Sequence, residues 1–251
     1  MNEKFISSYS RHSDDYEKYR PGYPEAILTY LEQNIALNRE KSIIDVGSGT
    51  GIFTELLLKK NYAVTAIEPN TEMRTKAENK LSTYTGLTSI NASAEETTLA
   101  DKSVDLIVVA QSFHWFHPEL TRKEFKRIAK PGAYLLLIWN ILQQRSAFLK
   151  DYQALKNKYT GKKPYQEKIN ISIIDRFLSP GNRVEQEVYH SRQLDKNGLL
   201  GYFRSASYSP VQGDQDYPVL VEELERIFDK HQRNGFVKLE YDAKLFLAPL
   251  L

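Results

Sequence analysis

A glycine-rich turn between a predicted strand and a predicted helix carries the clearest chemistry in this sequence. The segment Asp45–Gly51 reads DVGSGTG, follows the apolar pair Ile43-Ile44 and precedes an amphipathic run over 52–58. Glycines at alternate positions let the backbone pass close to a ligand without a Cβ in the way. The first amides of the following helix point toward that ligand. The pattern therefore predicts a nucleotide-like ligand at this turn.

The spacing of the glycines narrows the class of ligand. A triphosphate-binding loop ends in Gly-Lys-Ser/Thr, whereas Gly51 is followed here by Ile52-Phe53. A dinucleotide fold prefers Gly-x-Gly-x-x-Gly, but this turn is Gly-x-Gly-x-Gly with an acid, Asp45, two residues before it. A second acid, Glu68, ends the next predicted strand, where a carboxylate can accept hydrogen bonds from ribose hydroxyls. Glu68 would serve a nicotinamide dinucleotide equally well, so an NAD(P)-dependent oxidoreductase stays open as an alternative.

The composition excludes several classes of site and partner. The 251 residues carry a formal net charge of +2, which is too mild to indicate nucleic acid or an anionic membrane as partner. There is no cysteine, so neither a disulfide nor a thiolate site can form. No run approaches the roughly 20 apolar residues of a membrane span, and the first residues do not read as a signal peptide. We therefore expect a cytoplasmic protein. We expect no metal site, because no group of His, Asp and Glu residues has the spacing of metal ligands.

Strands and helices alternate along most of the chain. We expect strands over 42–46, 63–67, 88–92, 104–110, 133–139, 185–194 and 237–247, and helices from residue 24 and over 50–60, 72–81, 120–129, 195–205 and 219–234. Alternation of this kind predicts βαβ units and a parallel sheet with helices on both faces. The expected fold class is α/β, a doubly wound Rossmann-like sheet of seven mostly parallel strands with a small helical cap.

A single domain over 1–251 is expected, with four parts. Residues 1–40 would form an N-terminal lid and helix, and 41–140 the ligand-binding core. Residues 141–180 break the alternation and are helix-prone, with Phe148, Tyr152, Leu155 and Tyr159 on one face. We interpret them as a cap inserted over the sheet. Residues 181–251 would complete the sheet.

The glycine turn, with Asp45 before it and Glu68 after it, resembles that of class I S-adenosylmethionine-dependent methyltransferases. The resemblance extends to Ala94-Glu95 with the acidic segment 101–105, and to Lys130-Pro131-Gly132 before a buried strand. The segments Tyr16–Pro24 and Gln111–Phe116 resemble a small-molecule branch related to trans-aconitate and ubiquinone/menaquinone-pathway methyltransferases. Residues 1–140 carry this likeness, and beyond them it is only architectural.

The resemblance implies S-adenosylmethionine as cofactor, with S-adenosylhomocysteine as product. The residues it assigns to the cofactor are Tyr19, Arg20, Asp45, Gly47, Ser48, Gly49, Gly51, Glu68, Pro69, Asn70, Met73, Ser93, Ala94, Glu95 and Gln111. In this scheme Asp45 orders the amides of the turn, Glu68 binds the ribose, and Met73 and Glu95 lie near the adenine. The alternatives are a core position for Met73 and a solvated loop charge for Glu95. Arg20 would clamp a carboxylate from the lid or be a surface arginine, and Tyr9 and Tyr16 could close the same pocket.

The acceptor side is harder to predict. His114 could act as a general base, or it could be a structural histidine packed against Trp115. Phe113, Trp115, Tyr202 and Arg204 are the expected acceptor contacts. The nucleic-acid methyltransferase motif Asn/Asp-Pro-Pro-aromatic is absent, because residues 110–113 read AQSF.

The predicted function is O-, C- or N-methylation of a small organic acceptor, possibly a carboxylate, by in-line displacement. The partner would be that acceptor alone, without nucleic acid or membrane, in a monomer or homodimer. A non-catalytic module that only binds S-adenosylmethionine is a further alternative.

Overall fold

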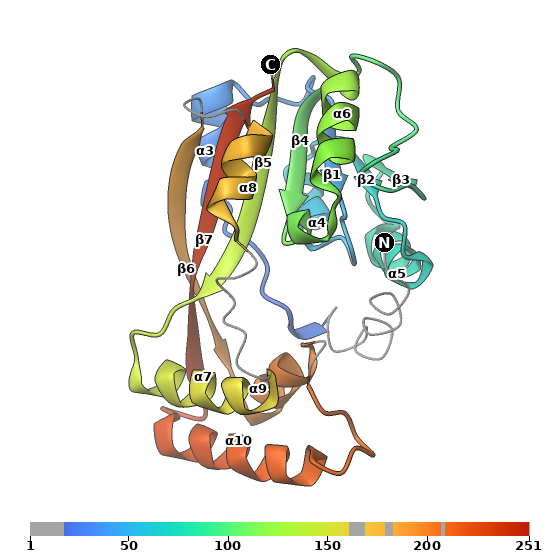
Figure 1. Ribbon diagram of the computed structural model, residues 1–251. Helices are drawn as coiled ribbons and strands as arrows, with labels where there is room; N and C mark the ends of the chain where they lie inside the picture. The colour runs from blue at the N-terminus through green and yellow to red at the C-terminus, as the bar shows by residue number, and fades with distance from the viewer. Residues whose placement is uncertain (1–17, 161–168, 179–182, 207–208, 251) are drawn as a thin grey trace.

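One seven-stranded sheet organises the molecule. The computed structural model describes residues 18–160, 169–178, 183–206 and 209–250, so Tyr9 and Tyr16 lie outside the described residues. The strands are β1 (Ile43–Val46), β2 (Val64–Ile67), β3 (Leu87–Ile90), β4 (Val104–Ala110), β5 (Ala129–Leu142), β6 (Val184–Leu194) and β7 (Val237–Pro249). Their order is β3-β2-β1-β4-β5-β7-β6 (Figure 1). The first five run parallel, and β7 lies antiparallel between β5 and β6. The expected fold class is confirmed.

Helices cover both faces of the sheet because successive residues of its central strands point to opposite sides. Ile43 of β1 packs in the core under α3 (Ala26–Ile35) and α4 (Ile52–Lys59). Ile44 packs in the core under α6 (Pro118–Ile128) and α8 (Ile171–Leu178). Strands of this kind read as continuous apolar runs in the sequence. A fifth helix, α5 (Thr71–Leu81), follows β2.

Three helices form the cap, which lies on the side where the parallel strands end. They are α7 (Ala147–Thr160), α9 (Lys196–Arg204) and α10 (Tyr217–His231), and Figure 1 shows them together below the sheet. Their apolar faces share one core with Leu194 at the end of β6 and with Leu239 and Tyr241 on β7. The long antiparallel strands β6 and β7 therefore join the cap to the sheet.

The expected cap over 141–180 is corrected by this arrangement. Its first part, α7, lies in the cap, and Phe148, Tyr152 and Leu155 are buried there as their spacing predicts. Its second part, α8, instead buries Ile174 and Phe177 against the sheet beside α6. The cap takes α9 and α10 from the region that was expected only to complete the sheet. Within the described part of the chain, no helix combines the length and apolar character that crossing a bilayer requires.

Candidate active site

The glycine turn adopts a backbone that only glycine accommodates easily. Gly47, Gly49 and Gly51 have φ angles of +66°, +58° and +77°. A Cβ on Gly47 would lie 2.7 Å from the side chain of Ser112, and one on Gly51 would lie 2.7 Å from Cδ1 of Leu81. Two of the three glycines are therefore required by packing as well as by backbone conformation.

The middle glycine differs, because the space beside it is open. A Cβ on Gly49 would meet only Sδ of Met73, at 3.9 Å. Met73 is itself buried, and its amide donates to Oδ1 of Asn70, the residue that caps α5. The turn thus leaves its central backbone accessible, with Met73 at the border and Pro69-Asn70 leading into α5. A ligand that packs on the backbone fits this arrangement.

Glu68 is fixed at the end of β2. Its Oε2 accepts a hydrogen bond from the amide of Gly49 at 2.9 Å, and its Oε1 accepts one from the amide of Asn70 at 2.8 Å. The side chain is almost fully buried, and this burial raises the pKa of Glu68 although both amides act to lower it. Each carboxylate oxygen can accept a second hydrogen bond. The carboxylate is thus oriented and keeps acceptor capacity for a ligand's hydroxyls.

Asp45 does not order the amides of the turn, so that prediction is wrong. Its Oδ2 accepts a hydrogen bond from the Thr54 hydroxyl of α4 at 2.6 Å. The amides of Gly47 and Ser48 donate to the carbonyl of Ile67, at 2.8 and 3.2 Å, and Gly49 is held by Glu68. The other carboxylate oxygen, Oδ1, is buried without a hydrogen-bond partner among the described residues. Complete burial raises the pKa of Asp45 to about 7.

The loop after β3 is tied to the start of α6. Ala94 is buried, and Ser93 pairs with Glu96 in an isolated bridge. Oε1 of Glu95 accepts a hydrogen bond from the amide of His117, the N-cap residue of α6, at 2.9 Å. Glu95 is therefore bound to the protein and is not simply a solvated loop charge.

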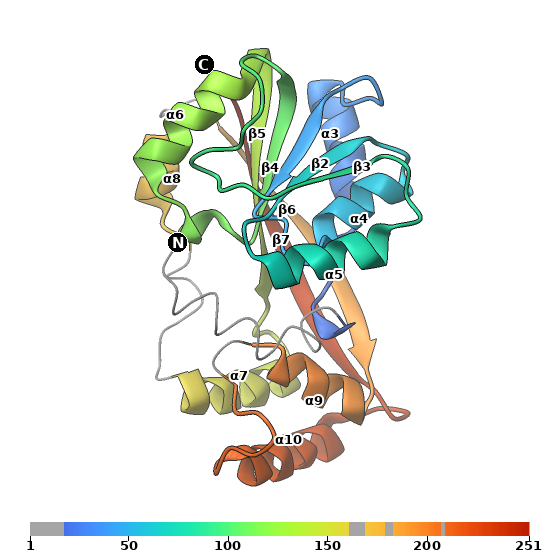
Figure 2. The same cartoon turned by 90° about the vertical axis from the view of Figure 1, so that its right-hand side faces the viewer.

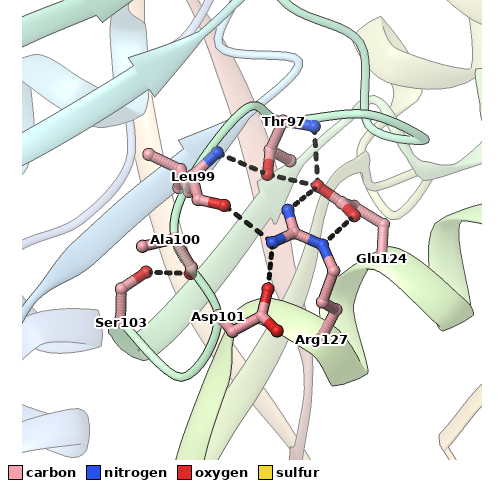
Figure 3. A network of polar contacts seen from close by, with 7 residues as sticks. All are labelled: Thr97, Leu99, Ala100, Asp101, Ser103, Glu124 and Arg127. Carbon is pink, nitrogen blue, oxygen red and sulfur yellow. Dashed lines mark hydrogen bonds and ion pairs between the residues drawn. The ribbon is translucent and has the colours of Figure 1, made fainter.

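A charged network holds the next part of this loop (Figure 3). Arg127 of α6 binds both carboxylate oxygens of Glu124, at 2.8 and 2.7 Å, and also the carbonyl of Leu99 and the carboxylate of Asp101. Glu124 in turn accepts hydrogen bonds from the amide and hydroxyl of Thr97. The guanidinium of Arg127 and these two donors lower the pKa of Glu124 to about 2. This network, which was not predicted from the sequence, fixes the segment that follows Ser93–Glu95.

Gln111 follows β4 in the left-handed region, with φ at +63°. Its amide donates to the carbonyl of Ile138 at 2.9 Å, and its side-chain Nε2 donates to the carbonyl of Asn140 at 3.3 Å. The next residue, Ser112, donates its hydroxyl to the carbonyl of Val46. The end of β4 is thus joined both to β5 and to the strand that leads into the glycine turn.

Residues 19–22, here termed the strap, connect the N-terminal segment to the cap and to the far edge of the sheet. The Tyr19 ring lies directly against Gly201 of α9, where a Cβ would clash with it. Nη2 of Arg20 donates to the carbonyl of Ser205 at 2.9 Å. Nη1 of Arg192, on β6, donates to the carbonyls of Tyr19 and Arg20, at 2.7 and 3.2 Å. Figure 2 shows the strap passing between the sheet and the cap helices.

Aromatic rings run from the cap to β6. Tyr152 of α7 stacks on Tyr202 of α9, with centroids 5.9 Å apart. Tyr202 meets Tyr241 of β7 edge-on, and Tyr241 stacks on His190 of β6 at 5.1 Å. Arg204 donates to the hydroxyl of Tyr217 at 3.1 Å. This wall lies at the edge of the sheet where ligands bind in doubly wound folds.

Comparison with known proteins identifies a methyltransferase domain in this chain. Residues 44–137, from the glycine turn to β5, match the model of the methyltransferase domain family. The chain is 27% identical over 231 residues to an uncharacterized methyltransferase of Schizosaccharomyces pombe, an alignment that covers 89% of each protein. It is 33% identical over 136 residues to one from Mycobacterium tuberculosis, covering 54% of this chain and only 53% of that protein. The solved structure of a candidate type II methyltransferase from Anaeromyxobacter dehalogenans has the same fold, with a TM-score of 0.73 and 20% identity over 93% of this chain and 99% of that one.

The chain carries a methyltransferase domain and is an S-adenosylmethionine-dependent methyltransferase. Its cofactor is S-adenosylmethionine, and the alternative of a nicotinamide-dependent oxidoreductase is set aside. The open backbone at Gly49, the oriented carboxylate of Glu68 and the unpartnered Oδ1 of Asp45 fit this cofactor. The individual cofactor contacts remain predictions.

The residues predicted to contact the acceptor of this methyltransferase lie in different surroundings. Phe113 lies in the core, packed against Trp139 at 6.3 Å and Phe177 at 4.9 Å, so its position favours a packing role. His114 lies 4.6 Å from Trp115, ring centre to ring centre, and both of its ring nitrogens are buried. That placement favours the structural interpretation of His114.

Tyr202 and Arg204 both lie on α9, in the cap. Asn140, His190 and Tyr241 were missed. The signal that could have found His190 is the alternation of residues in the strand expected over 185–194. In the structure this alternation places Val188, His190, Arg192 and Leu194 on the inner face of β6.

Proposed function

We propose that this methyltransferase transfers a methyl group to a small organic acceptor that binds between the glycine turn and the cap helices. When bound, S-adenosylmethionine supplies an electrophilic methyl group on a sulfonium. The observation that carries the proposal is the cradle of Gly49, Glu68 and Met73 at the sheet edge that faces the cap. Tyr202 and Arg192 on the cap side offer a flat surface and a positive charge to the acceptor.

The protein's contribution in this proposal is positioning and exclusion of water. Displacement at a sulfonium needs the nucleophile, the methyl carbon and the sulfur in line, and alignment alone can lower the barrier by several kcal/mol. The strap is bound by Arg192, by Gly201 and by the carbonyl of Ser205. A closed strap would keep water from the reacting atoms. Methylation at oxygen, carbon or nitrogen, including a carboxylate oxygen, is compatible with this role.

The proposed partner is this small acceptor alone, in a cytoplasmic monomer or homodimer. The formal net charge of +2 gives no general attraction to nucleic acid or to anionic lipid. A catalytically silent binding module is the competing proposal, and only turnover distinguishes the two.

Calorimetric titration tests the cofactor site. We expect S-adenosylhomocysteine to bind the wild-type protein and NADH not to bind. Glu68→Ala removes charge-assisted hydrogen bonds, which are worth about 1.5–3 kcal/mol, so affinity should fall roughly 10- to 150-fold. Glu225→Ala, at an exposed position on α10, is the matched control and should bind as wild type. Failure of S-adenosylhomocysteine to bind the wild-type protein would contradict the proposal.

Turnover is tested by release of S-adenosylhomocysteine with a panel of small carboxylic acids, phenols, alcohols and amines. At least one member should be methylated at a rate above the background hydrolysis of the cofactor. Tight cofactor binding with no turnover across the panel would favour the silent binding module.

A further inference from the structure

Asn140, near the end of β5, joins the strap, β4 and β6 through one side chain and one carbonyl. Its Nδ2 donates to the carbonyl of Gly22 at 3.0 Å, and its backbone carbonyl accepts from Nε2 of Gln111. Its Oδ1 lies 2.9 Å from Nε2 of His190. The side chain is 7% exposed, so these contacts determine how the amide is oriented.

The sheet brings Asn140 and His190 together across a small residue. β7 lies between their strands, and its Ala243 pairs with Asn140 on one side and with Val188 on the other. His190, two residues after Val188, stands on the same face and pairs with Tyr241. A methyl side chain at 243 leaves room for the imidazole to reach over β7. A larger residue there would separate the two groups.

These contacts determine which nitrogen of His190 carries the proton. The carbonyl of Gly22 can only accept, so the NH2 group of Asn140 must face it and Oδ1 must face His190. An amide oxygen can only accept, so Nε2 of His190 donates. In the neutral imidazole the other nitrogen, Nδ1, is then the acceptor. The orientation of Asn140 therefore selects the tautomer, as a carboxylate or amide does for a catalytic histidine.

The acceptor nitrogen of His190 is available to a bound molecule. Among the described residues Nδ1 has no hydrogen-bond partner, and it is not one of the buried unpartnered atoms. Half-burial of the ring lowers the pKa of His190, while Asp242 of β7 acts to raise it. Arg192 lies two residues later on the same strand, and its guanidinium donates to the carbonyls of Tyr19 and Arg20. The lowered pKa favours the neutral form of the ring, whose Nδ1 can take up a proton.

We propose that His190 is the proton acceptor of the methyl transfer, with Asn140 as its positioning residue, and that the acceptor is a molecule with an ionisable hydroxyl or amino group. This inference rests on the proposed function. The acceptor's oxygen or nitrogen forms a bond to the methyl carbon as the carbon–sulfur bond breaks and its electron pair passes to sulfur. The proton of the acceptor passes to Nδ1 of His190. The products are the methylated acceptor, neutral S-adenosylhomocysteine and an imidazolium, which then loses its proton to water.

Nitrogen NMR of the wild-type protein bound to S-adenosylhomocysteine tests the tautomer directly. Two-bond nitrogen–proton correlations at pH 7 should show a protonated Nε2 and an unprotonated Nδ1 for His190. Asn140→Ala removes the fixed acceptor, and the spectrum should change to the mixture of tautomers of an unrestrained imidazole. A protonated Nδ1 at pH 7 in the wild-type protein would overturn the inference.

Kinetics test the role in transfer, with the first panel compound that turns over as acceptor. His190→Gln keeps an NH donor toward Asn140 but removes the proton acceptor. We expect kcat to fall about 100-fold or more, since proton transfer by a positioned side chain contributes roughly 10²–10⁴-fold. The acidic limb of the pH–rate profile should disappear, with the KM for S-adenosylmethionine unchanged. His231→Gln, at the histidine of α10 that binds Asp151, is the matched control and should keep both rate and profile.

The outcomes separate this inference from the function it rests on. Turnover by His190→Gln at the wild-type rate with an unchanged pH profile would overturn the role of His190 alone. No turnover of any panel compound by the wild-type protein would overturn the proposed function and this role with it, while the NMR result would still report the tautomer.

Discussion

Alanine substitution at three left-handed glycines should separate backbone strain, packing and access to the cofactor. Gly132 has φ at +80° and no atom within 4 Å of a Cβ built on it, so Gly132→Ala should cost only the left-handed strain, about 1–2 kcal/mol. Gly51 has nearly the same φ, but its Cβ would lie 2.7 Å from Leu81 and 3.3 Å from Ala77. Overpacking adds about 1–3 kcal/mol. Gly51→Ala should therefore lose about 2–5 kcal/mol of stability.

Gly49→Ala should behave differently from both. Its Cβ would touch only Sδ of Met73, at 3.9 Å, so the stability lost should match that of Gly132→Ala. The new methyl group would instead stand where we propose that the cofactor packs on the backbone. We expect its affinity for S-adenosylhomocysteine to fall roughly tenfold or more, which is at least about 1.4 kcal/mol. Gly132→Ala should bind as wild type.

Urea unfolding gives the stability of each variant, and calorimetry gives its affinity for S-adenosylhomocysteine. The difference in unfolding free energy between Gly51→Ala and Gly132→Ala isolates the packing contribution, because the φ angles of the two glycines nearly match. Equal losses of stability at 51 and 132 would refute the packing argument for the turn. Wild-type affinity in Gly49→Ala would refute the assignment of Gly49 to the cofactor.

Four further substitutions test individual polar groups. Burial raises the pKa of Asp45 from 3.8 to about 7, so between these pH values the native state holds a proton that the unfolded state has lost, and the free energy of unfolding should fall as pH rises through this range. In Asp45→Asn the free energy of unfolding, measured from pH 4 to 8, should no longer fall in this way. The variant should be more stable than the wild type by up to about 4 kcal/mol at pH 8. The pKa of Glu124 is lowered to about 2, so the stability that its ionised form contributes is present above about pH 4.5 and is lost as pH falls toward 2. Glu124→Gln should lower the free energy of unfolding by about 1–2 kcal/mol at pH 7 and by progressively less as the pH falls. The hydroxyl of Tyr241 is buried without a hydrogen-bond partner in the described structure, so Tyr241→Phe should leave Tm unchanged or raise it. Tyr62→Phe removes a 2.7 Å hydrogen bond to the carboxylate of Glu32 and should lower Tm. A lower Tm for Tyr241→Phe would contradict the argument.

The contact between the glycine turn and Glu68 was predictable because its determinants are local in sequence. Gly49 and Glu68 belong to the same βαβ unit, in which Gly49 follows β1 and Glu68 follows β2. The parallel register of β1 and β2 brings the ends of these strands together. The error at Asp45 arose within the same unit. A carboxylate two residues before a glycine turn can reach either the turn or the first turn of the following helix, and the buried hydroxyl of Thr54 decided which.

The contact between Asn140 and His190 could not be predicted because it depends on how β6 and β7 pair. Asn140 and His190 are 50 residues apart, and the contact requires β7 to enter between β5 and β6. The sequence predicts both strands, but alternation within a strand does not name its neighbours. The same limit explains α8. Its apolar face predicts burial, and only the tertiary structure shows that this face packs on the sheet and not in the cap.

The strap imposes an order on assembly during synthesis. Its residues 19–22 leave the ribosome long before their partners Arg192, Gly201 and Ser205 are made. The glycine turn and β1 to β5 can pair as they emerge, because their contacts are between neighbouring units. Docking of the strap must wait until about 185 further residues have been added, since Arg20 and Ser205 are that far apart. A nascent chain that stops between β5 and β6 would therefore have its glycine turn in place while the strap is still unattached.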